Sequence, residues 1–277
     1  MTDQYAVIGN PVAHTKSPLI HAEFARQTGQ DISYTAILAP LDGFHAAVER
    51  FKSEGGKGLN VTLPFKREAW DLVDFHRDYA YDANAVNTIK FVDDKMVGYN
   101  TDGIGLVRDI KDNLQYPIKG KRVLLMGSGG AAYGVMEPLL REQPEQLVVA
   151  NRTLEKALSF VGHFKTIQNI ATRSVSACPY DALGHAQFDI VINATSAGLS
   201  GAMPQLPDTV FVPGALAYDM VYGKTTPFLR FAQEHGARIA DGTGMLVEQA
   251  AESFFIWRGM RPQTAPVIRL LRRKAEE

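Results

Sequence analysis

The sequence has little cysteine, no long apolar run and no excess of charge, and each absence excludes a class of protein. Its single cysteine, Cys178, cannot form an internal disulfide and suits a reducing compartment. No apolar run approaches the roughly 18 residues of a membrane span, and an expected strand at residues 5–8 leaves no room for a signal peptide before it. The formal net charge of −1 leaves no basic face for nucleic acid. We expect a cytoplasmic protein without nucleic-acid or membrane partners.

The sequence also lacks internal repeats, low-complexity segments and the spacing of metal ligands. Its 7 histidines are scattered along the chain, so we expect no metal site. The 277 residues, 45% hydrophobic and 21% charged, are enough for about two domains with cores of their own.

Strand and helix patterns alternate from the start of the chain, which predicts α/β layering. The expected strands are 5–8, 33–38 and 58–62, and the expected helices are 18–27, with Ser17 as its cap, and 44–52. Residues 88–92 and 96–99 flank a short polar turn and predict an antiparallel hairpin. The first domain should therefore contain a mixed sheet.

A glycine turn follows an apolar strand at residues 123–126 and leads into a helix at 131–141. Gly127 permits a sharp turn, Gly129 permits close approach of a pyrophosphate, and Ala132 is the small third residue of a G-x-G-x-x-G/A pattern. The N-terminus of the helix offers free N–H groups to phosphates. With a second strand at 146–150, these spacings predict a Rossmann-type dinucleotide-binding domain.

The residue type at the tip of the second strand indicates which dinucleotide is bound. A chain that binds NAD usually has Asp or Glu there for the ribose 2′-hydroxyl, whereas this chain has Arg152. A guanidinium fits a 2′-phosphate in a bidentate way. The sequence therefore predicts NADP as the cofactor.

Further strands at 189–193 and 216–220, and helices near 245–257 and 265–274, complete the expected order. We expect three parts. Residues 1–103 form a substrate-binding and catalytic domain, residues 104–238 form the NADP-binding domain, and residues 239–277 are helices that pack back on the first domain.

Polar side chains gather after the expected strands of the first domain, where ligands bind in open α/β sheets. Thr15, Ser17, Asn60, Thr62 and Asn87 make directional hydrogen bonds suited to a small polyhydroxylated ligand. Two further residues, Lys66 and Asp102, are the candidates for proton handling. Structural roles stay open: Ser17 and Asp102 could cap helices, and Asn60 and Thr62 could end a strand. Lys66 fits such a role less well, because a lysine at a helix start opposes the helix dipole.

These segments together resemble the shikimate dehydrogenase family across essentially the whole chain. The matching motifs, in order, are Gly9-Asn10-Pro11 with His14-Thr15-Lys16-Ser17-Pro18, Asn60-Val61-Thr62-Leu63-Pro64-Phe65-Lys66, Ala85-Val86-Asn87-Thr88, Asn100-Thr101-Asp102-Gly103, residues 127–134, Asn151-Arg152-Thr153, Asn193-Ala194-Thr195-Ser196-Ala197-Gly198, Tyr218-Asp219-Met220 and residues 241–249. The resemblance implies NADPH-dependent reduction of 3-dehydroshikimate to shikimate by a monomer or homodimer.

The resemblance also implies roles for individual residues. Lys66 and Asp102 would be the catalytic pair. The substrate-binding residues would be Thr15 and Ser17 for the carboxylate, with Asn60, Thr62, Asn87, Asp102, Tyr222 and Gln249. The cofactor-binding residues would be Gly127, Ser128, Gly129, Gly130, Ala131, Asn151, Arg152, Thr153, Lys156, Thr195, Met220 and Gly242.

Three positions depart from the family pattern. Thr15 stands where serine is common, Ala132-Tyr133 where a polar residue often follows the glycine turn, and Lys156 where relatives can carry arginine. Two alternatives stay open: a quinate/shikimate dehydrogenase with relaxed substrate or NAD use, and a non-catalytic NADP-binding sensor.

Overall fold

The computed structural model describes residues 2–167, 175–197 and 201–276, and the chain divides into two compact units. The first unit comprises Met1–Gly105 and Val247–Leu270, and the second comprises Leu106–Leu246 and Leu271–Glu277. Across the described ranges, no helix combines the length and apolar character needed to span a bilayer.

The first unit is built on a six-stranded sheet in the order β2-β1-β3-β5-β6-β4. Strands β1, β2 and β3 are mutually parallel, whereas β5 runs antiparallel to both β3 and β6, so the predicted hairpin and mixed sheet are confirmed. Its elements are β1 (Asp3–Gly9), α1 (Ser17–Thr28), β2 (Ile32–Leu38), α2 (Phe44–Ser53), β3 (Gly56–Val61), α3 (Lys66–Leu72), β4 (Phe75–His76), α4 (Ala80–Ala83), β5 (Thr88–Val92), β6 (Lys95–Tyr99) and α5 (Asp102–Arg108), which continues into the second unit.

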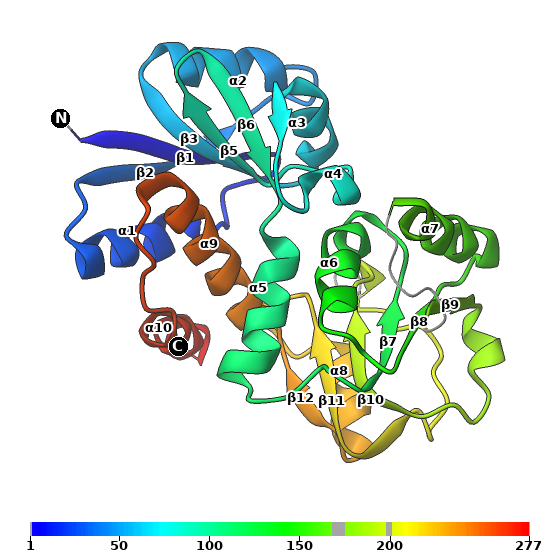
Figure 1. Cartoon of the computed structure of the whole chain (residues 1–277). Helices are drawn as coiled ribbons and strands as arrows, with labels where there is room; N and C mark the ends of the chain where they lie inside the picture. Colours follow the sequence, from blue (N-terminus) through cyan, green and yellow to red (C-terminus); the bar gives the residue numbers. More distant parts are fainter. Residues whose placement is uncertain (1, 168–174, 198–200, 277) are drawn as a thin grey trace. The chain divides into compact units, whose positions relative to one another are not determined.

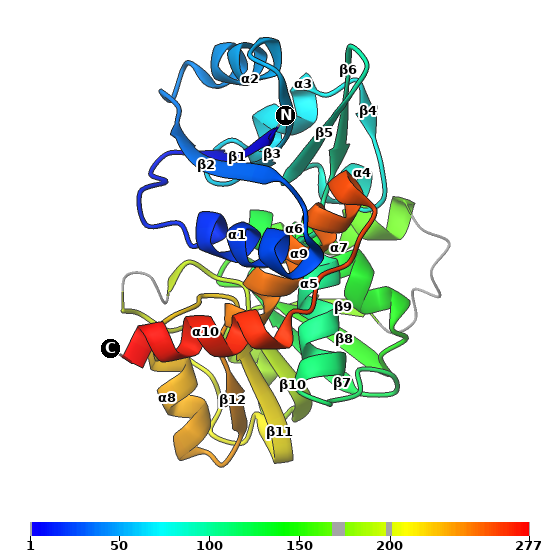
Figure 2. The same cartoon turned by 90° about the vertical axis from the view of Figure 1, so that its left-hand side faces the viewer.

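Helices cover both faces of this sheet (Figures 1 and 2). On one face, Phe44 of α2 and Phe65, just before α3, stack at 4.9 Å over alternate apolar residues of the strands. On the other face lie α1 and the helix α9 (Thr243–Arg258). Trp257 of α9 donates from Nε1 to the carbonyl of Ile89 at 3.0 Å and crosses β3 at Gly58. A Cβ at Gly58 would lie 2.4 Å from that nitrogen, so only glycine leaves room for the indole.

The second unit is built on a six-stranded sheet in the order β12-β11-β10-β7-β8-β9, and every pairing in it is parallel. The order reverses direction at β7, as in dinucleotide-binding folds. Its elements are a π-helical turn (Asp109–Asn113), β7 (Arg122–Met126), α6 (Gly130–Arg141), β8 (Gln146–Ala150), α7 (Leu154–Ile167), β9 (Val175–Cys178), a 3₁₀ turn (Tyr180–Leu183), β10 (Phe188–Asn193), β11 (Phe211–Asp219), α8 (Pro227–Glu234), β12 (Arg238–Ala240) and α10 (Ala265–Glu276), which begins in the first unit.

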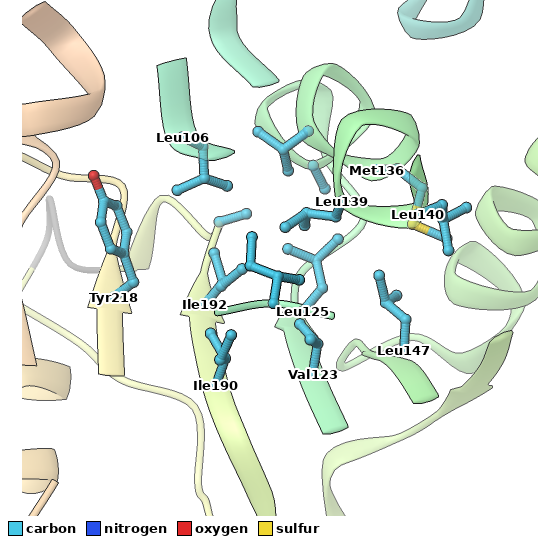
Figure 3. Close-up of a cluster of buried hydrophobic side chains, with 14 of the residues drawn as sticks. Leu106, Val123, Leu125, Met136, Leu139, Leu140, Leu147, Ile190, Ile192 and Tyr218 are labelled. Carbon is cyan, nitrogen blue, oxygen red and sulfur yellow. The ribbon is translucent and has the colours of Figure 1, made fainter. Parts of the chain in front are cut away.

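Apolar side chains fill both faces of the second sheet because its strands are buried on both sides. Figure 3 shows the larger cluster, in which Val123 and Leu125 of β7 face Met136 and Leu139 of α6. The ring of Tyr218 closes one end of this cluster (Figure 3). The alternate residues of the same strands pack against α8 on the opposite face.

Two sequence interpretations need correction. Ser17 is not the cap of α1, because Lys16 occupies the N-cap position and makes no side-chain capping bond, while the Ser17 hydroxyl accepts a bond from Thr15. Strands β4, β9 and β12 were not expected, although each pairs with a neighbour in its sheet; the three residues of β12 pair with β11. Strand β12 is too short for a period-2 pattern to show in the sequence.

Candidate functional site

In the first unit, a lysine and an aspartate form an ion pair. Lys66 Nζ lies 2.6 Å from Asp102 Oδ2, and the two side chains are 28% and 12% exposed. Lys66 is the first residue of α3, and its carbonyl accepts the N–H of Val86, which ties the start of this helix to the segment before β5. Asp102 begins α5, and its backbone N–H donates to Asn100 Oδ1 at 3.1 Å. The pair is therefore held from two separate parts of the fold.

Asn87 connects the pair to the neighbouring strands. Its Nδ2 donates to the other carboxylate oxygen of Asp102 at 2.8 Å, and its Oδ1 accepts the backbone N–H of Thr101 at 2.9 Å. Its own backbone bonds to Tyr99 and Val61 on either side, so the side chain projects from a fixed position. Asp102 thus accepts from Lys66 and from Asn87 on different oxygens, which leaves its carboxylate little freedom to turn.

Asn60, at the end of β3, is oriented by a buried tyrosine. The Tyr34 hydroxyl donates to Asn60 Oδ1 at 2.7 Å, while Asn60 Nδ2 lies 3.0 Å from Ser253 Oγ. Burial raises the pKa of the Tyr34 phenol well above 10, so the hydroxyl keeps its proton and acts as the donor. The ring of Tyr34 stacks on His21 at 4.1 Å, and burial lowers the pKa of that imidazole to about 3, so His21 is neutral.

Three further predicted residues lie in, or directly after, the loops that follow β1 and β3 of the first unit. Thr15 Oγ1 donates to Ser17 Oγ at 3.1 Å and accepts the Ser17 N–H, so the two hydroxyls form a local pair. Thr62 follows β3, and its methyl group packs so close to Gly9 that a Cβ there would lie 2.4 Å from it. The Thr62 methyl group is therefore held against Gly9, where only glycine leaves room for it.

Helix α9 brings Gln249 to the same group of polar side chains. Asn87 Nδ2 and Thr101 Oγ1 lie 3.4 and 3.3 Å from Gln249 Oε1. One turn further along, the fully buried Ser253 donates to the carbonyl of Gln249 and bonds to Thr88 at 2.8 Å. A residue 147 or more positions away in sequence thus reaches the side chains around Lys66 and Asp102.

The glycine turn of the second unit leaves open space where a phosphate group could bind. Gly127 has φ of +95° and donates to the carbonyl of Ala150, which fixes the turn at the end of β7. A Cβ at Gly129 or Gly130 would meet no atom within 4 Å, so packing within the described chain does not require glycine there. Ala132, by contrast, is fully buried against the sheet. Exposed N–H groups at the start of α6, beside an unfilled space, fit a pyrophosphate.

Two exposed cations lie after β8. Arg152 and Lys156 are both exposed, and neither makes an ion pair with any residue that the structure describes. Asn151 Nδ2 donates to the carbonyl of Thr153, which shapes the turn before α7. Cations that lack an acidic partner are suited to the 2′-phosphate that distinguishes NADP from NAD.

The loops after β10 and β11 carry the remaining predicted cofactor residues. The hydroxyl of Thr195 donates to Asn193 Oδ1 at 2.7 Å, and the N–H of Met220 donates to the carbonyl of Asn193. Gly242 passes so close to Met220 that a Cβ would lie 2.4 Å from its carbonyl oxygen. Tyr222 belongs to the second unit, is 39% exposed, and has a phenol whose pKa is raised by burial. Gly198 of the matching motif lies outside the described residues.

Within the described ranges, the protein has no cluster of three or more His, Cys, Asp or Glu residues that could hold a metal. Burial also raises the pKa of the Cys178 thiol, which disfavours the thiolate that a nucleophile would need.

The sequence interpretation missed the residues that orient the predicted ones. Tyr34, Thr88, Thr101 and Ser253 bond directly to Asn60 or Asn87, yet none was selected as a site residue. Thr88 and Thr101 stood inside the matched motifs and could have been chosen on that signal. Tyr34 and Ser253 lie in an ordinary strand and an ordinary helix, with no local pattern to mark them.

Three family descriptions match successive parts of the chain. They are the shikimate dehydrogenase substrate binding domain at residues 7–89, shikimate / quinate 5-dehydrogenase at residues 109–200, and the shikimate 5′-dehydrogenase C-terminal domain at residues 242–272. A curated relative from Nitrosospira multiformis, named shikimate dehydrogenase (NADP(+)), is 58% identical over 98% of both chains.

Solved structures agree with this result. The Ael1 enzyme from Pseudomonas putida is 50% identical, covers 98% of both chains and superposes with a TM-score of 0.91. Shikimate 5-dehydrogenase from Thermus thermophilus, solved with NADP(H) and shikimate, is 31% identical over 99% of this chain and 100% of its own, with a TM-score of 0.86. With these relatives and the geometry of both units, the chain belongs to the shikimate dehydrogenase family.

Proposed function

We propose that the protein is an NADP-dependent oxidoreductase that interconverts 3-dehydroshikimate and shikimate. The observation that carries this proposal is the Lys66–Asp102 ion pair of 2.6 Å, held by Asn87 amid neutral hydrogen-bonding groups. A protein that only bound a ligand would have no need of a lysine and a carboxylate in this arrangement. The full-length similarity to NADP-dependent shikimate dehydrogenases supports the same activity.

NADPH, when bound, supplies a hydride to the carbonyl carbon of the substrate. The carbonyl oxygen then gains negative charge, and the Lys66 ammonium stabilises that charge and donates a proton to give the hydroxyl. Asp102 keeps the ammonium in place by accepting its hydrogen bond at 2.6 Å. In the reverse direction, the lysine accepts the proton as the hydride leaves.

The polar groups of the first unit match a small carboxylated polyol. We assign the substrate carboxylate to the hydroxyls of Thr15 and Ser17, which already bond to each other. The substrate hydroxyls are assigned to Asn60, Thr62, Asn87, Asp102 and Gln249 of the first unit, and the resemblance adds Tyr222 as a substrate-binding residue. These groups are neutral apart from Asp102, which suits recognition of hydroxyls by donors and acceptors of fixed direction.

The second unit holds the cofactor in this proposal. The exposed start of α6 after Gly127 receives the pyrophosphate. The residues after β8, Asn151, Arg152, Thr153 and Lys156, receive the adenosine 2′-phosphate, and Thr195, Met220 and Gly242 contact the nicotinamide half. The open space at Gly129 and Gly130 supports this assignment, and so do the exposed cations after β8, which form no ion pair within the described part of the chain.

The test is spectrophotometric reduction of NADP⁺ and NAD⁺ with shikimate, in wild type and Arg152→Ala. Removing the guanidinium should cost about 2 kcal/mol in kcat/KM for NADP⁺, the scale of a hydrogen bond to a charged group, and leave NAD⁺ little changed. Arg238→Ala, an exposed arginine at the start of β12, is the matched control and should behave as wild type. Equal losses with both cofactors would show that Arg152 has only a structural role.

A second substrate is favoured by one specific observation. The family description that matches residues 109–200 names quinate as well as shikimate. Parallel assays with both substrates decide between a narrow and a relaxed specificity, and absence of turnover with either would favour a non-catalytic NADP-binding sensor.

We also propose that the protein acts in the cytoplasm as a monomer or homodimer. Light scattering on the purified full chain, with and without NADP⁺, measures its molar mass and distinguishes these two states.

A further inference from the structure

We propose that Asp219 is a positioning residue for the cofactor, because one buried carboxylate holds together the two loops that carry Thr195, Met220 and Tyr222. The inference rests on the proposed function, which places the nicotinamide half of NADP at these loops. It concerns the second unit alone, and it assigns to Asp219 a role that acts through its neighbours.

Asp219 ends β11, and its carboxylate is fully buried. Oδ1 accepts the backbone N–H of Val221 at 3.0 Å, which starts the turn after the strand. Oδ2 accepts two bonds, from the hydroxyl of Thr226 at 2.5 Å and from Asn193 Nδ2 at 3.1 Å. Among the residues that the structure describes, no cation pairs with this carboxylate, so three neutral donors offset the cost of its burial.

The bond to Asn193 extends the effect to the loop after β10. With its amide nitrogen engaged by Asp219, Asn193 presents Oδ1 to the backbone N–H and the hydroxyl of Thr195, at 3.1 and 2.7 Å. The carbonyl of Asn193 accepts the N–H of Met220. One carboxylate therefore determines which way the Asn193 amide faces, and through it the position of Thr195.

A second carboxylate holds the far side of the loop that carries Tyr222. Asp241 Oδ2 accepts the N–H of Gly223 at 2.8 Å and the hydroxyl of Thr243 at 2.7 Å. The N–H of Gly242 donates to the carbonyl of Val221. Polar bonds thus hold residues 221–226 from both sides, although residues 222–225 are exposed. Polar bonds to Asp219 and Asp241 therefore hold the shape of this loop.

An Asp219→Asn substitution cannot satisfy all three donors. If the amide oxygen faces Thr226 and Asn193, the amide nitrogen points at the Val221 N–H. If the amide is turned round, its nitrogen points at the amide nitrogen of Asn193 instead. One donor is left facing another in either case, so the loops should sample open conformations. When only a tenth of the molecules hold the binding conformation, the apparent Kd rises about tenfold.

The experiment measures the Kd for NADP⁺ by isothermal titration calorimetry on the full chain, and the amide hydrogen exchange of the protein without NADP⁺. Asp219→Asn should weaken NADP⁺ about tenfold and increase exchange in peptides that cover 193–197 and 219–226. Thr226→Val should act in the same direction, and Thr226→Ser, which keeps the hydroxyl, should bind as wild type. The control is Asp189→Asn at the opposite end of β10, whose carboxylate accepts from Arg122 N–H and Lys121.

Asp189→Asn should lower Tm without changing the Kd for NADP⁺. An equal change in Kd for Asp189→Asn and Asp219→Asn would mean that Asp219 acts only through general stability and would overturn the proposal. Wild-type affinity for NADP⁺ in Asp219→Asn would also overturn the proposal. If Asp219→Asn does not fold, wild-type affinity in Thr226→Val would overturn the proposal. If Arg152→Ala weakens NADP⁺ binding and Asp219→Asn does not, the proposed function stands and the Asp219 proposal fails. If wild type does not bind NADP⁺, both the proposed function and the Asp219 proposal are refuted.

Discussion

Removing the Lys66 ammonium should abolish most turnover while leaving the fold in place. The side chain is 28% exposed, and among the described residues it donates a hydrogen bond to Asp102, which keeps a second bond from Asn87 after the change. The Asp102 carboxylate therefore keeps a hydrogen-bond donor, so the substitution should lower the rate of the reaction more than the stability of the fold. Loss of a positioned acid or electrostatic stabiliser lowers kcat by about 10²-fold or more.

Steady-state kinetics with shikimate at saturating NADP⁺ on Lys66→Ala, Asp102→Asn and the double variant provide the measurement. If the two residues act as a unit, the double variant loses little beyond either single one. Lys95→Ala is the control, because Lys95 forms an ion pair of 2.8 Å with Asp74 in the same unit but outside the site. Wild-type turnover in Lys66→Ala would refute the catalytic assignment, and a raised KM with unchanged kcat would make Lys66 a binding residue only.

Two further predictions concern the first unit. Gly58→Ala would place a Cβ 2.4 Å from Trp257 Nε1 and 2.8 Å from the carbonyl of Ile89, so urea unfolding should show a loss of about 1–3 kcal/mol; an unchanged midpoint would show that α9 tolerates displacement. His21 is neutral in the folded protein with a pKa of about 3, whereas the unfolded chain binds a proton below about pH 6.5. Its contribution to stability is therefore complete above pH 6.5 and is lost progressively as pH falls toward 3. Between pH 7 and 5 the unfolding free energy of wild type should fall by about 2 kcal/mol more than that of His21→Phe, and parallel slopes would contradict the assignment.

Local patterns predicted most of the fold. The apolar run that follows Gln146 located β8 at its observed bounds, and the polar turn at residues 93–95 correctly indicated the antiparallel pair β5 and β6. The strand, glycine turn and helix from β7 to α6 were recognisable because each depends on residues close together in sequence. Ser17 was assigned wrongly as a cap, because a serine before a helix fits both that role and the hydroxyl pair with Thr15 that the structure contains.

The sequence by itself determined the residue types of the site and the cofactor class. A short segment is enough to show Arg152 at the end of one strand and Lys66 and Asp102 after others. Ligands of open α/β sheets bind at the carboxyl ends of strands, so the chemistry of these side chains could be interpreted from the sequence. The tertiary structure alone decided which side chains touch. Ser253 and Gln249 of α9 meet Asn60 and Asn87 because Trp257 anchors that helix across Gly58, and hydrogen bonds between residues more than 150 positions apart leave no local periodicity in the chain.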